Sequence, residues 1–228
     1  MHERERPGRP PVTSRMELEQ VALDLFGRHG FNETTLDDIA AAASIARRTF
    51  FGYFSSKNDV VWGDFDTLLR GMEAWLGGVP GDMPLLEALV DAVIRFNALP
   101  PEAVPAHRQR MSLILHVPAL QAHSTLRYAE WRNVVARFAA RRLGEPVDGL
   151  RPQLIGQLAL GSAVAAYERW LADDAAELGV LLAEAFRSWA LVHETFPAPP
   201  ADGCTNWAKR TGRRRVCLSN SSPARRCG

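Results

Sequence analysis

The spacing of apolar residues along the chain predicts helices almost throughout, and no segment shows the alternation of a half-buried strand. Ser14 and Glu17 have the spacing of a capping box, and Gly30 ends the helical stripe that follows them. Thr35 and Asp38 mark the start of a second, shorter helix in the same way. Before the glycine-rich turn that follows residue 76, we expect helices over 14–29, 35–43, 46–53 and 57–76.

A second group of apolar stripes predicts longer helices in the rest of the chain. Pro100 and Pro101 close the first of them, Gly144 stops a long one, and Pro152 has the position of a proline in a first helical turn. The expected helices of this group cover 85–99, 108–117, 119–143, 152–172 and 178–192. Together the two groups predict an all-α chain of about nine helices.

These boundaries predict four segments with different roles. Residues 1–13 are charged and precede the first helix, so we expect a flexible N-terminal arm. Residues 14–60 would form a small helical head, and residues 61–196 a larger helical body. Residues 197–228 are rich in Arg, Ser and Cys and have almost no apolar pattern, which predicts a disordered tail. Its basic run is either simply solvated or a non-specific contact for nucleic acid.

Composition and charge narrow the class of protein. The chain is 46% hydrophobic and 23% charged, as soluble globular proteins are, and no apolar run approaches the roughly 20 residues that span a bilayer. The N-terminus is charged and has no apolar core, so we expect a cytoplasmic protein without a secretory signal. All three cysteines lie after residue 200, which leaves the head and body without a disulfide framework or thiolate metal site. The net charge of +1 still permits a local basic surface.

The short helices expected over 35–43 and 46–53 are joined by a tight turn, as in a helix-turn-helix that places its second helix in the major groove. Arg47 and Arg48 fall at the exposed start of that second helix, where arginine can form two hydrogen bonds to guanine. Elsewhere such arginines would be solvated charges, but this motif favours contact with bases or phosphates. The other candidate DNA contacts are Thr35, Thr49, Phe51, Tyr53 and Lys57. Arg9 belongs either to a floppy leader or to an arm that enters the minor groove.

This stretch resembles the DNA-binding motif of the TetR family of transcriptional regulators. The residues that carry the resemblance are Ile39, Ala40, Ala43, Ile45, Thr49, Phe50, Phe51, Tyr53, Phe54 and Lys57. Three positions depart from favourable geometry: Ser44 replaces the usual turn glycine, Ala46 replaces the usual N-cap serine, and Gly52 lies inside the second helix. The resemblance implies a TetR-like fold, with a three-helix DNA-binding head and a helical body that binds a ligand and dimerises.

Two longer segments, 50–65 and 107–131, resemble the regulators of mycofactocin gene clusters within this family. The similarity covers roughly residues 8–192. It implies a repressor of genes for a peptide-derived redox cofactor, and it suggests an acyl-coenzyme-A effector. Beyond such a small-molecule effector, we expect no cofactor.

Polar and aromatic residues gather near the junction of the helices expected over 108–117 and 119–143. They form either a packed core with a polar edge, or a pocket with apolar walls and a few polar anchors. In a pocket, Arg127 or Arg132 would meet an anionic headgroup. The candidate ligand-binding residues are Phe96, Met111, Leu115, His116, His123, Arg127, Tyr128 and Trp131.

The alternatives are a helical enzyme and an architectural DNA-binding protein without a ligand. His116 with Glu130, or the pair of histidines, suggests acid–base chemistry, but the sequence shows no nucleophile elbow, phosphate loop or metal-ligand spacing. We therefore expect neither an enzyme nor a metal site. The long body argues against an architectural protein, because DNA binding alone needs fewer helices.

The last two body helices are expected to form a homodimer. A strip of small residues permits close approach of a second helix, and it consists of Gly156, Ala159, Ala163 and Ala166. Two large apolar residues on the final helix, Phe186 and Trp189, would anchor the contact. Such a dimer would place two recognition helices roughly 34 Å apart on a palindromic operator. The helix expected over 57–76 belongs to both head and body, so a ligand that tilts it would release DNA. The operator sequence, the effector and the direction of its effect stay open.

Overall fold

The computed structural model describes residues 14–195, with side chains up to Trp189, and every regular element in that range is helical. The helices are α1 (Arg15–His29), α2 (Leu36–Ala42), α3 (Arg47–Tyr53), α4 (Lys57–Trp62), α5 (Phe65–Gly78), α6 (Leu85–Phe96), the 3-10 turn η1 (Pro101–Ala103), α7 (Val104–His116), α8 (Pro118–Leu143), α9 (Leu150–Leu171) and α10 (Leu178–Thr195). The all-α prediction is confirmed for these residues. Arg9 and the tail after residue 196 lie outside them. Residues up to Phe186 belong to one compact unit, and the rest of α10 is a separate one.

Side-chain caps start the first two helices as the sequence predicts. Ser14 Oγ accepts a hydrogen bond from the Glu17 backbone N–H at 3.2 Å, and Glu17 Oε2 accepts one from the Ser14 N–H at 3.0 Å. In the second capping box the Thr35 hydroxyl donates to Asp38 Oδ2 at 2.7 Å, and this bond holds the pKa of Asp38 below its usual value. Both helix starts are therefore fixed by local contacts.

The helix expected over 57–76 is broken in two, which corrects the prediction. Gly63 has φ 55° and ψ −136°, a conformation that side chains disfavour, and it separates α4 from α5. The described residues consequently contain ten α-helices and one 3-10 turn, where about nine helices were expected. The apolar stripe runs on through Val61 and Phe65, which are both buried, so it conceals the break.

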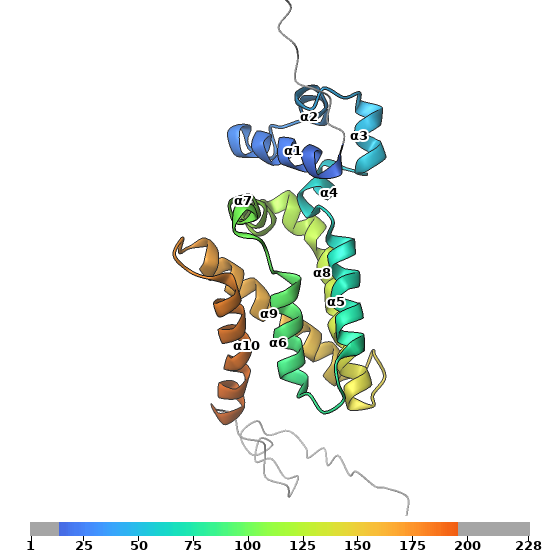
Figure 1. Ribbon diagram of the computed structural model, residues 1–228, viewed down its shortest axis with the longest axis vertical. Coiled ribbons are helices and arrows are strands. Elements are labelled where there is room, and N and C mark those ends of the chain that lie inside the picture. Colours follow the sequence, from blue (N-terminus) through green and yellow to red (C-terminus); the bar gives the residue numbers. More distant parts are fainter. Residues whose placement is uncertain (1–13, 196–228) are drawn as a thin grey trace, which may run out of the picture. The chain divides into compact units, whose positions relative to one another are not determined.

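The head consists of α1, α2 and α3, with α4 leading away from it (Figure 1). Six side chains of its core come from α1 to α4 and from the residue that follows α3, and each is at most 3% exposed: Leu18, Phe26, Ile39, Phe50, Phe54 and Val60. The centres of the Phe50 and Phe54 rings lie 5.9 Å apart, so the middle and the C-terminal end of α3 are anchored in one cluster. This packing leaves the opposite face of α3 in solvent.

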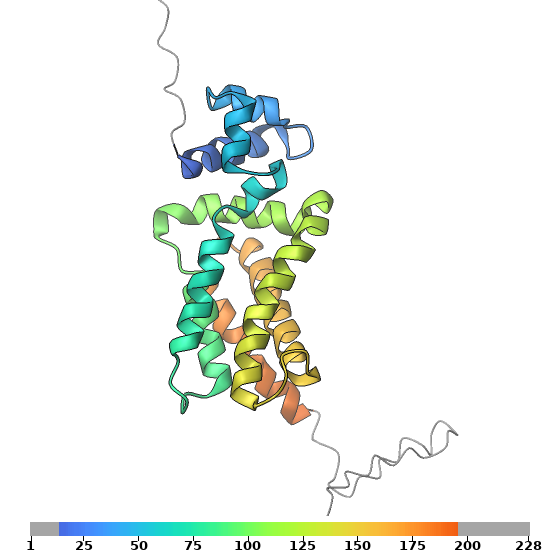
Figure 2. The same cartoon turned by 90° about the vertical axis from the view of Figure 1, so that its right-hand side faces the viewer.

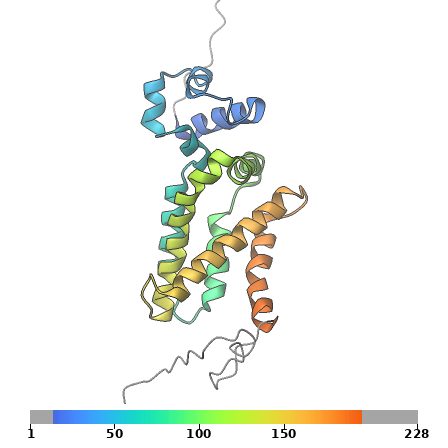
Figure 3. The same cartoon turned by 180° about the vertical axis from the view of Figure 1, so that it is seen from behind.

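The body is built from α5, α6, α8 and α9, and α7 lies across its upper end beneath the head (Figure 2). Seen from behind, α9 starts beside the lower end of α8 and runs diagonally upward across the body, and the two helices pack against each other (Figure 3). Leu89, Val93, Trp131, Val135 and Phe138 form the core, each at most 4% exposed. Because α7 contacts α1 and α4 as well as α8 and α9, it connects the head to the body.

The small-residue strip of α9 faces the inside of its own chain, not a partner. A Cβ on Gly156 would lie 3.0 Å from the Arg132 carbonyl oxygen of α8, and Ala159, Ala163 and Ala166 are at most 8% exposed. Phe186 is also fully buried within the unit. The predicted dimer surface is therefore wrong in these residues: the strip serves the close packing of α9 against α8.

Two residues of the helix-turn-helix are expected to limit its stability. Ser44 has φ 57° in the turn between α2 and α3, and Ala46 makes no side-chain cap at the start of α3. Ser44→Gly and Ala46→Ser should each raise the free energy of unfolding by about 1 kcal/mol, by removing left-handed strain and by adding a cap. Urea denaturation measures both effects. Ala41→Gly, inside α2, is the control and should lower stability; no gain in either variant would mean that the turn is unstrained.

Candidate DNA-binding surface and ligand cavity

The exposed face of α3 carries the residues that the sequence predicts for DNA reading. Arg47, Arg48 and Thr49 are all exposed in its first turn, while Phe50 on the other side is fully buried. The chain therefore presents the start of α3 to solvent and uses its aromatic face to hold the helix in place. This is the arrangement that a recognition helix needs in order to enter a groove.

The two arginines differ in their surroundings. Arg47 forms an ion pair with Asp37 of α2 at 3.2 Å, and its guanidinium lies 5.9 Å from the centre of the exposed Phe51 ring. Arg48 has neither a hydrogen bond nor an ion pair within the described residues. Arg48 is consequently free to contact DNA, whereas Arg47 would first have to leave Asp37. An exposed pair of this kind is weak, so the exchange costs little.

Lys57 has a structural role that the sequence does not indicate. Its ammonium donates to the carbonyls of Phe31 at 2.6 Å and Thr34 at 2.9 Å, and lies 4.2 Å from the Phe31 ring centre. Burial lowers the pKa of this amine. Lys57 thus fastens the start of α4 to the loop between α1 and α2. Its contact with phosphate stays a prediction, as do those of the exposed Thr35 and the half-buried Tyr53.

His123 and Arg127 of α8 face the junction of α4 and α5, not a pocket. Arg127 Nη1 pairs with Asp66 Oδ1 of α5 at 2.7 Å, and Arg127 Nη2 lies 3.8 Å from Asp59 Oδ1 of α4. His123 Nε2 is 3.2 Å from the same Asp59 oxygen. These contacts join α8 to the two helices that lead into the head. The anchor role predicted for both residues is replaced by a role in this junction.

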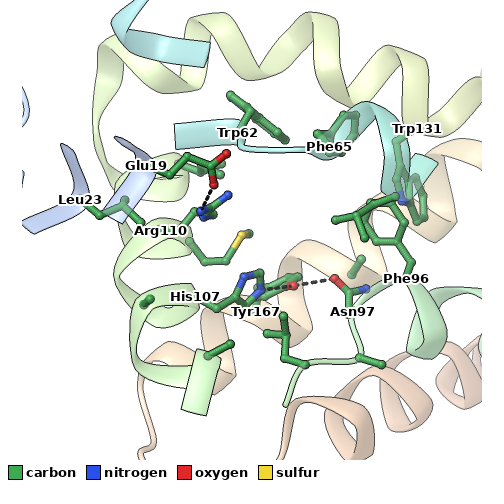
Figure 4. Close-up of a pocket in the computed structure, with 18 of the residues that line it drawn as sticks. Glu19, Leu23, Trp62, Phe65, Phe96, Asn97, His107, Arg110, Trp131 and Tyr167 are labelled. Atoms are coloured by element: carbon green, nitrogen blue, oxygen red, sulfur yellow. Dashed lines mark hydrogen bonds and ion pairs between the residues drawn. The ribbon is translucent and has the colours of Figure 1, made fainter. Parts of the chain in front are cut away.

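A cavity of about 410 Å³ lies between the head and the body (Figure 4). Four of the predicted ligand-binding residues line it: Phe96, Met111, Tyr128 and Trp131. The other four, Leu115, His116, His123 and Arg127, do not. His116 is exposed at the end of α7, where its Nδ1 lies 3.0 Å from the Ser112 carbonyl oxygen. The pocket interpretation is thereby favoured over the packed core. The polar residues that line the pocket differ from those that the sequence predicts.

One polar side of the cavity is a chain of hydrogen bonds across three helices. The Tyr167 hydroxyl donates to Asn97 Oδ1 at 2.5 Å and lies 2.8 Å from His107 Nε2 (Figure 4). Since the tyrosine proton is engaged with Asn97, His107 Nε2 must be the donor in the second bond. Burial lowers the pKa of His107 to about 4, with a smaller contribution from the nearby Arg110 charge. The imidazole is therefore neutral at pH 7, and burial also raises the pKa of Tyr167.

Two residues of the cavity wall also carry donor atoms that are fully buried. Trp62 Nε1 and the Tyr128 hydroxyl are buried and have no hydrogen-bond partner among the described residues. Their rings are in edge contact, with centres 5.6 Å apart. Burial raises the pKa of the Tyr128 hydroxyl, so it remains a donor. A buried donor without a partner costs about 1–3 kcal/mol.

Further polar and charged residues of the cavity are not predicted from the sequence. Glu19 and Gln20 of α1, in the head, line it together with Arg110 of α7. His107, Arg110, Met111 and Ile114 all line it with the spacing of one helical face, a pattern that is visible in the sequence. The contribution of α1 has no such signal, because it depends on how the head meets the body.

Acidification is expected to destabilise the protein through His107. Its pKa is lower in the folded protein than in the unfolded chain, so its contribution is complete above about pH 6.5 and is lost as the pH falls towards 4. The loss should approach about 2–3 kcal/mol at pH 4. His107→Gln, which keeps a donor for Tyr167, should flatten the pH dependence of unfolding between pH 6.5 and 4. The exposed His116→Gln is the control, and identical pH profiles for His107→Gln and the wild type would contradict the assignment.

Comparison with known proteins identifies the family to which the chain belongs. Residues 20–61 match the model of bacterial regulatory proteins of the tetR family, and residues 83–194 match the MftR C-terminal domain. The chain is 42% identical over 181 residues to a Mycobacterium tuberculosis (strain ATCC 25618 / H37Rv) protein named as the mycofactocin biosynthesis transcriptional regulator MftR, covering 79% of this chain and 91% of that protein. The chain is a TetR-family transcriptional regulator. It has the MftR type of C-terminal domain, and it is a member of a family of regulators, not of enzymes.

Solved structures agree on the TetR-like fold. FadR of Bacillus subtilis, solved in complex with stearoyl-CoA, superposes with a TM-score of 0.55 at 16% identity, covering 77% of this chain and 97% of that chain. Thermus thermophilus FadR with lauroyl-CoA gives a TM-score of 0.51 at 21% identity, covering 82% and 99%. At these identities the likeness concerns the fold. Over the described residues, no helix of this TetR-family regulator is both long and apolar enough to cross a membrane.

Proposed function

We propose that this protein is a homodimeric repressor of mycofactocin-related genes, which binds a palindromic operator and releases it when an acyl-CoA binds in the body. The observation that carries the proposal is the position of the cavity. Met16, Glu19, Gln20 and Leu23 of α1 line it together with the body helices. A ligand in the cavity therefore touches the DNA-binding head directly, so its binding can depend on the position of the head.

The cavity suits an amphiphile with an apolar chain. Its volume of about 410 Å³ is within the range of small-molecule sites, and most of its wall is aliphatic or aromatic. Phe65, Phe96 and Trp131 form a row of edge-on rings with centres 5.9 and 6.4 Å apart. The acyl-CoA complexes of the two FadR structures support the same class of effector for this chain.

The dimer interface is assigned to the outward face of α9. Leu150, Leu154 and Leu158 are 82%, 50% and 45% exposed, and with the exposed Gly161 and Ala165 they follow helical spacing. A Cβ on Gly161 would meet nothing within 4 Å, so packing within the chain does not require glycine there. A glycine in the middle of a helix lowers stability by about 1 kcal/mol relative to alanine. Close approach of a second helix would explain why a glycine is present there. We therefore place a second copy of the chain on this face.

An architectural role without a ligand gains no support from the molecule. A cavity of this size, with two buried donors and no acceptor for them, weakens the core of a protein that only binds DNA. A regulator that must respond to a ligand needs such a space. The ligand-responsive interpretation is therefore preferred.

The proposal is tested first by its DNA and ligand partners. Footprinting upstream of mycofactocin genes should reveal a palindromic site that holds two protomers. Quenching of the cavity tryptophans, Trp62 and Trp131, should report binding of long-chain acyl-CoA more strongly than binding of free coenzyme A. A single protomer on an asymmetric site would refute the dimer, and absence of quenching by any acyl-CoA would refute the effector.

A further inference from the structure

An ion pair between the head and the body forms part of the cavity wall. Arg110 Nη2 of α7 lies 3.0 Å from Glu19 Oε2 of α1, and both side chains line the cavity (Figure 4). The side chains are 21% and 12% exposed, respectively. Glu19 is one of three polar residues that are buried in the described part of the chain. A carboxylate in such a place depends on its partner, because losing that partner leaves a buried charge uncompensated.

The pair lies against the break between α4 and α5. A Cβ on Gly63 would fall 2.1 Å from Arg110 Nη1 and 2.8 Å from Glu19 Oε2, so a side chain there would displace one or both of these groups. Arg15 of α1 donates to the Gly63 carbonyl at 2.9 Å and lies 3.5 Å from Glu19 Oε1. One cluster thus joins α1, α7 and the α4–α5 junction. A tilt of the head against the body would therefore change the distances within this cluster.

Arg110 is also the residue that an anion in the cavity would meet. Among the described residues that line the cavity, it is the only arginine or lysine. His107 does not compete for an anion, since it is buried and its Nε2 is engaged with Tyr167. The other acidic lining residue, Glu102, is exposed. A ligand anion and Glu19 are therefore the two possible partners for one guanidinium inside the cavity.

We propose that an anionic group of the effector, a carboxylate or a phosphate, binds Arg110 in place of Glu19. The inference rests on the proposed function and names the headgroup chemistry that the cavity selects. When the ligand takes Arg110, Glu19 keeps only the longer contact to Arg15, and the head loses its buried ion pair to α7. The free energy of ligand binding is in this way linked to the position of the head.

The linkage makes a reciprocal prediction about Glu19. Since Glu19 competes with the ligand, removing its charge should help anions to bind. Glu19→Gln should tighten binding of stearate or stearoyl-CoA about tenfold, and it should weaken operator binding when no ligand is present. Asp24→Asn removes a charge from the exposed side of the same helix and serves as the matched control. It should change neither affinity.

The experiment compares three probes on three proteins. The probes are stearate, stearoyl-CoA and uncharged methyl stearate, and each is titrated into the wild type, Glu19→Gln and Arg110→Met. Tryptophan fluorescence measures the affinity for the probe, and a labelled operator measures the affinity for DNA. Arg110→Met should lose about tenfold or more in affinity for whichever anionic probe the wild type prefers and should bind methyl stearate unchanged. A preference for stearate identifies a carboxylate, and a preference for stearoyl-CoA a phosphate. Thermal melting of each variant checks that it is folded.

The outcomes separate this inference from the proposed function. Suppose that the wild type binds a probe and releases DNA. If Arg110→Met then keeps the wild-type affinity for anionic probes and Glu19→Gln does not bind them more tightly, the headgroup assignment is wrong and the proposed function stands. If methyl stearate binds the wild type as tightly as the anions, the assignment is equally wrong. If no probe binds the wild type, both proposals are wrong.

Discussion

Replacing Leu154 and Leu158 together by aspartate is expected to turn the dimer into a monomer. Their side chains are half exposed in the protomer, so the double variant should fold normally, while two charges in a buried interface between copies would not be tolerated. Operator affinity should fall by about 30-fold or more, because one protomer contacts only half of a palindromic site. Light scattering at micromolar concentration measures the mass, and a gel shift measures the affinity.

The matched control is Leu126→Asp, which places the same charge on an exposed leucine of α8. This variant should remain dimeric and bind the operator as the wild type does. A double Leu154/Leu158 variant that still has the mass of a dimer would show that the copies meet elsewhere.

Arg48→Ala is expected to weaken operator binding by about 1–3 kcal/mol, or roughly 5- to 150-fold, without changing stability. The side chain is exposed and has no ion pair within the described residues, so its removal leaves the fold intact. Arg47→Ala should cost less, since that arginine gives up Asp37 before it reaches DNA. Competition with a scrambled duplex shows whether the loss is specific for the operator sequence, as a base contact requires.

Arg141→Ala provides the control for the change in charge. It removes an exposed arginine from the last turn of α8, far along the chain from α3, and should leave operator affinity unchanged. If Arg48→Ala and Arg47→Ala both bind the operator like the wild type, the reading face of α3 has been misassigned.

Local chemistry explains which parts of the fold the sequence predicts well. The capping boxes at Ser14 and Thr35 involve residues three apart, so their geometry follows from the sequence itself. The turn at Ser44 also keeps its left-handed form, although serine is a poor residue for it, because the backbone N–H groups of Ser44 and Ile45 donate to the carbonyls of Ala41 and Ala40. In both cases short-range contacts determine the structure.

Contacts between distant segments explain what the sequence does not predict. The apolar period of 57–76 is continuous, and only the conformation of Gly63 reveals two helices. On α9, small residues occur on both faces, and the sequence does not distinguish Gly156, which packs on Arg132, from Gly161, which faces outward. The choice depends on where α8 lies, which is a property of the tertiary fold.

The candidate ligand site shows the same division. Phe96, Met111, Tyr128 and Trp131 were predicted as wall residues because apolar side chains gather on the inner faces of their helices. The sequence does not locate the polar residues of the cavity, since Arg127 pairs with Asp66 and His123 lies against Asp59. These partners belong to helices that are distant in the sequence, so the pairing depends on the tertiary fold.

The central claim is that a ligand in the cavity changes the affinity of the head for DNA, and one titration tests it most directly. The operator Kd is measured at increasing stearoyl-CoA, while tryptophan fluorescence confirms in the same sample that the ligand is bound. The account predicts that the operator Kd rises by about tenfold or more at saturation. A protein that binds stearoyl-CoA to saturation and keeps its operator Kd unchanged would contradict it.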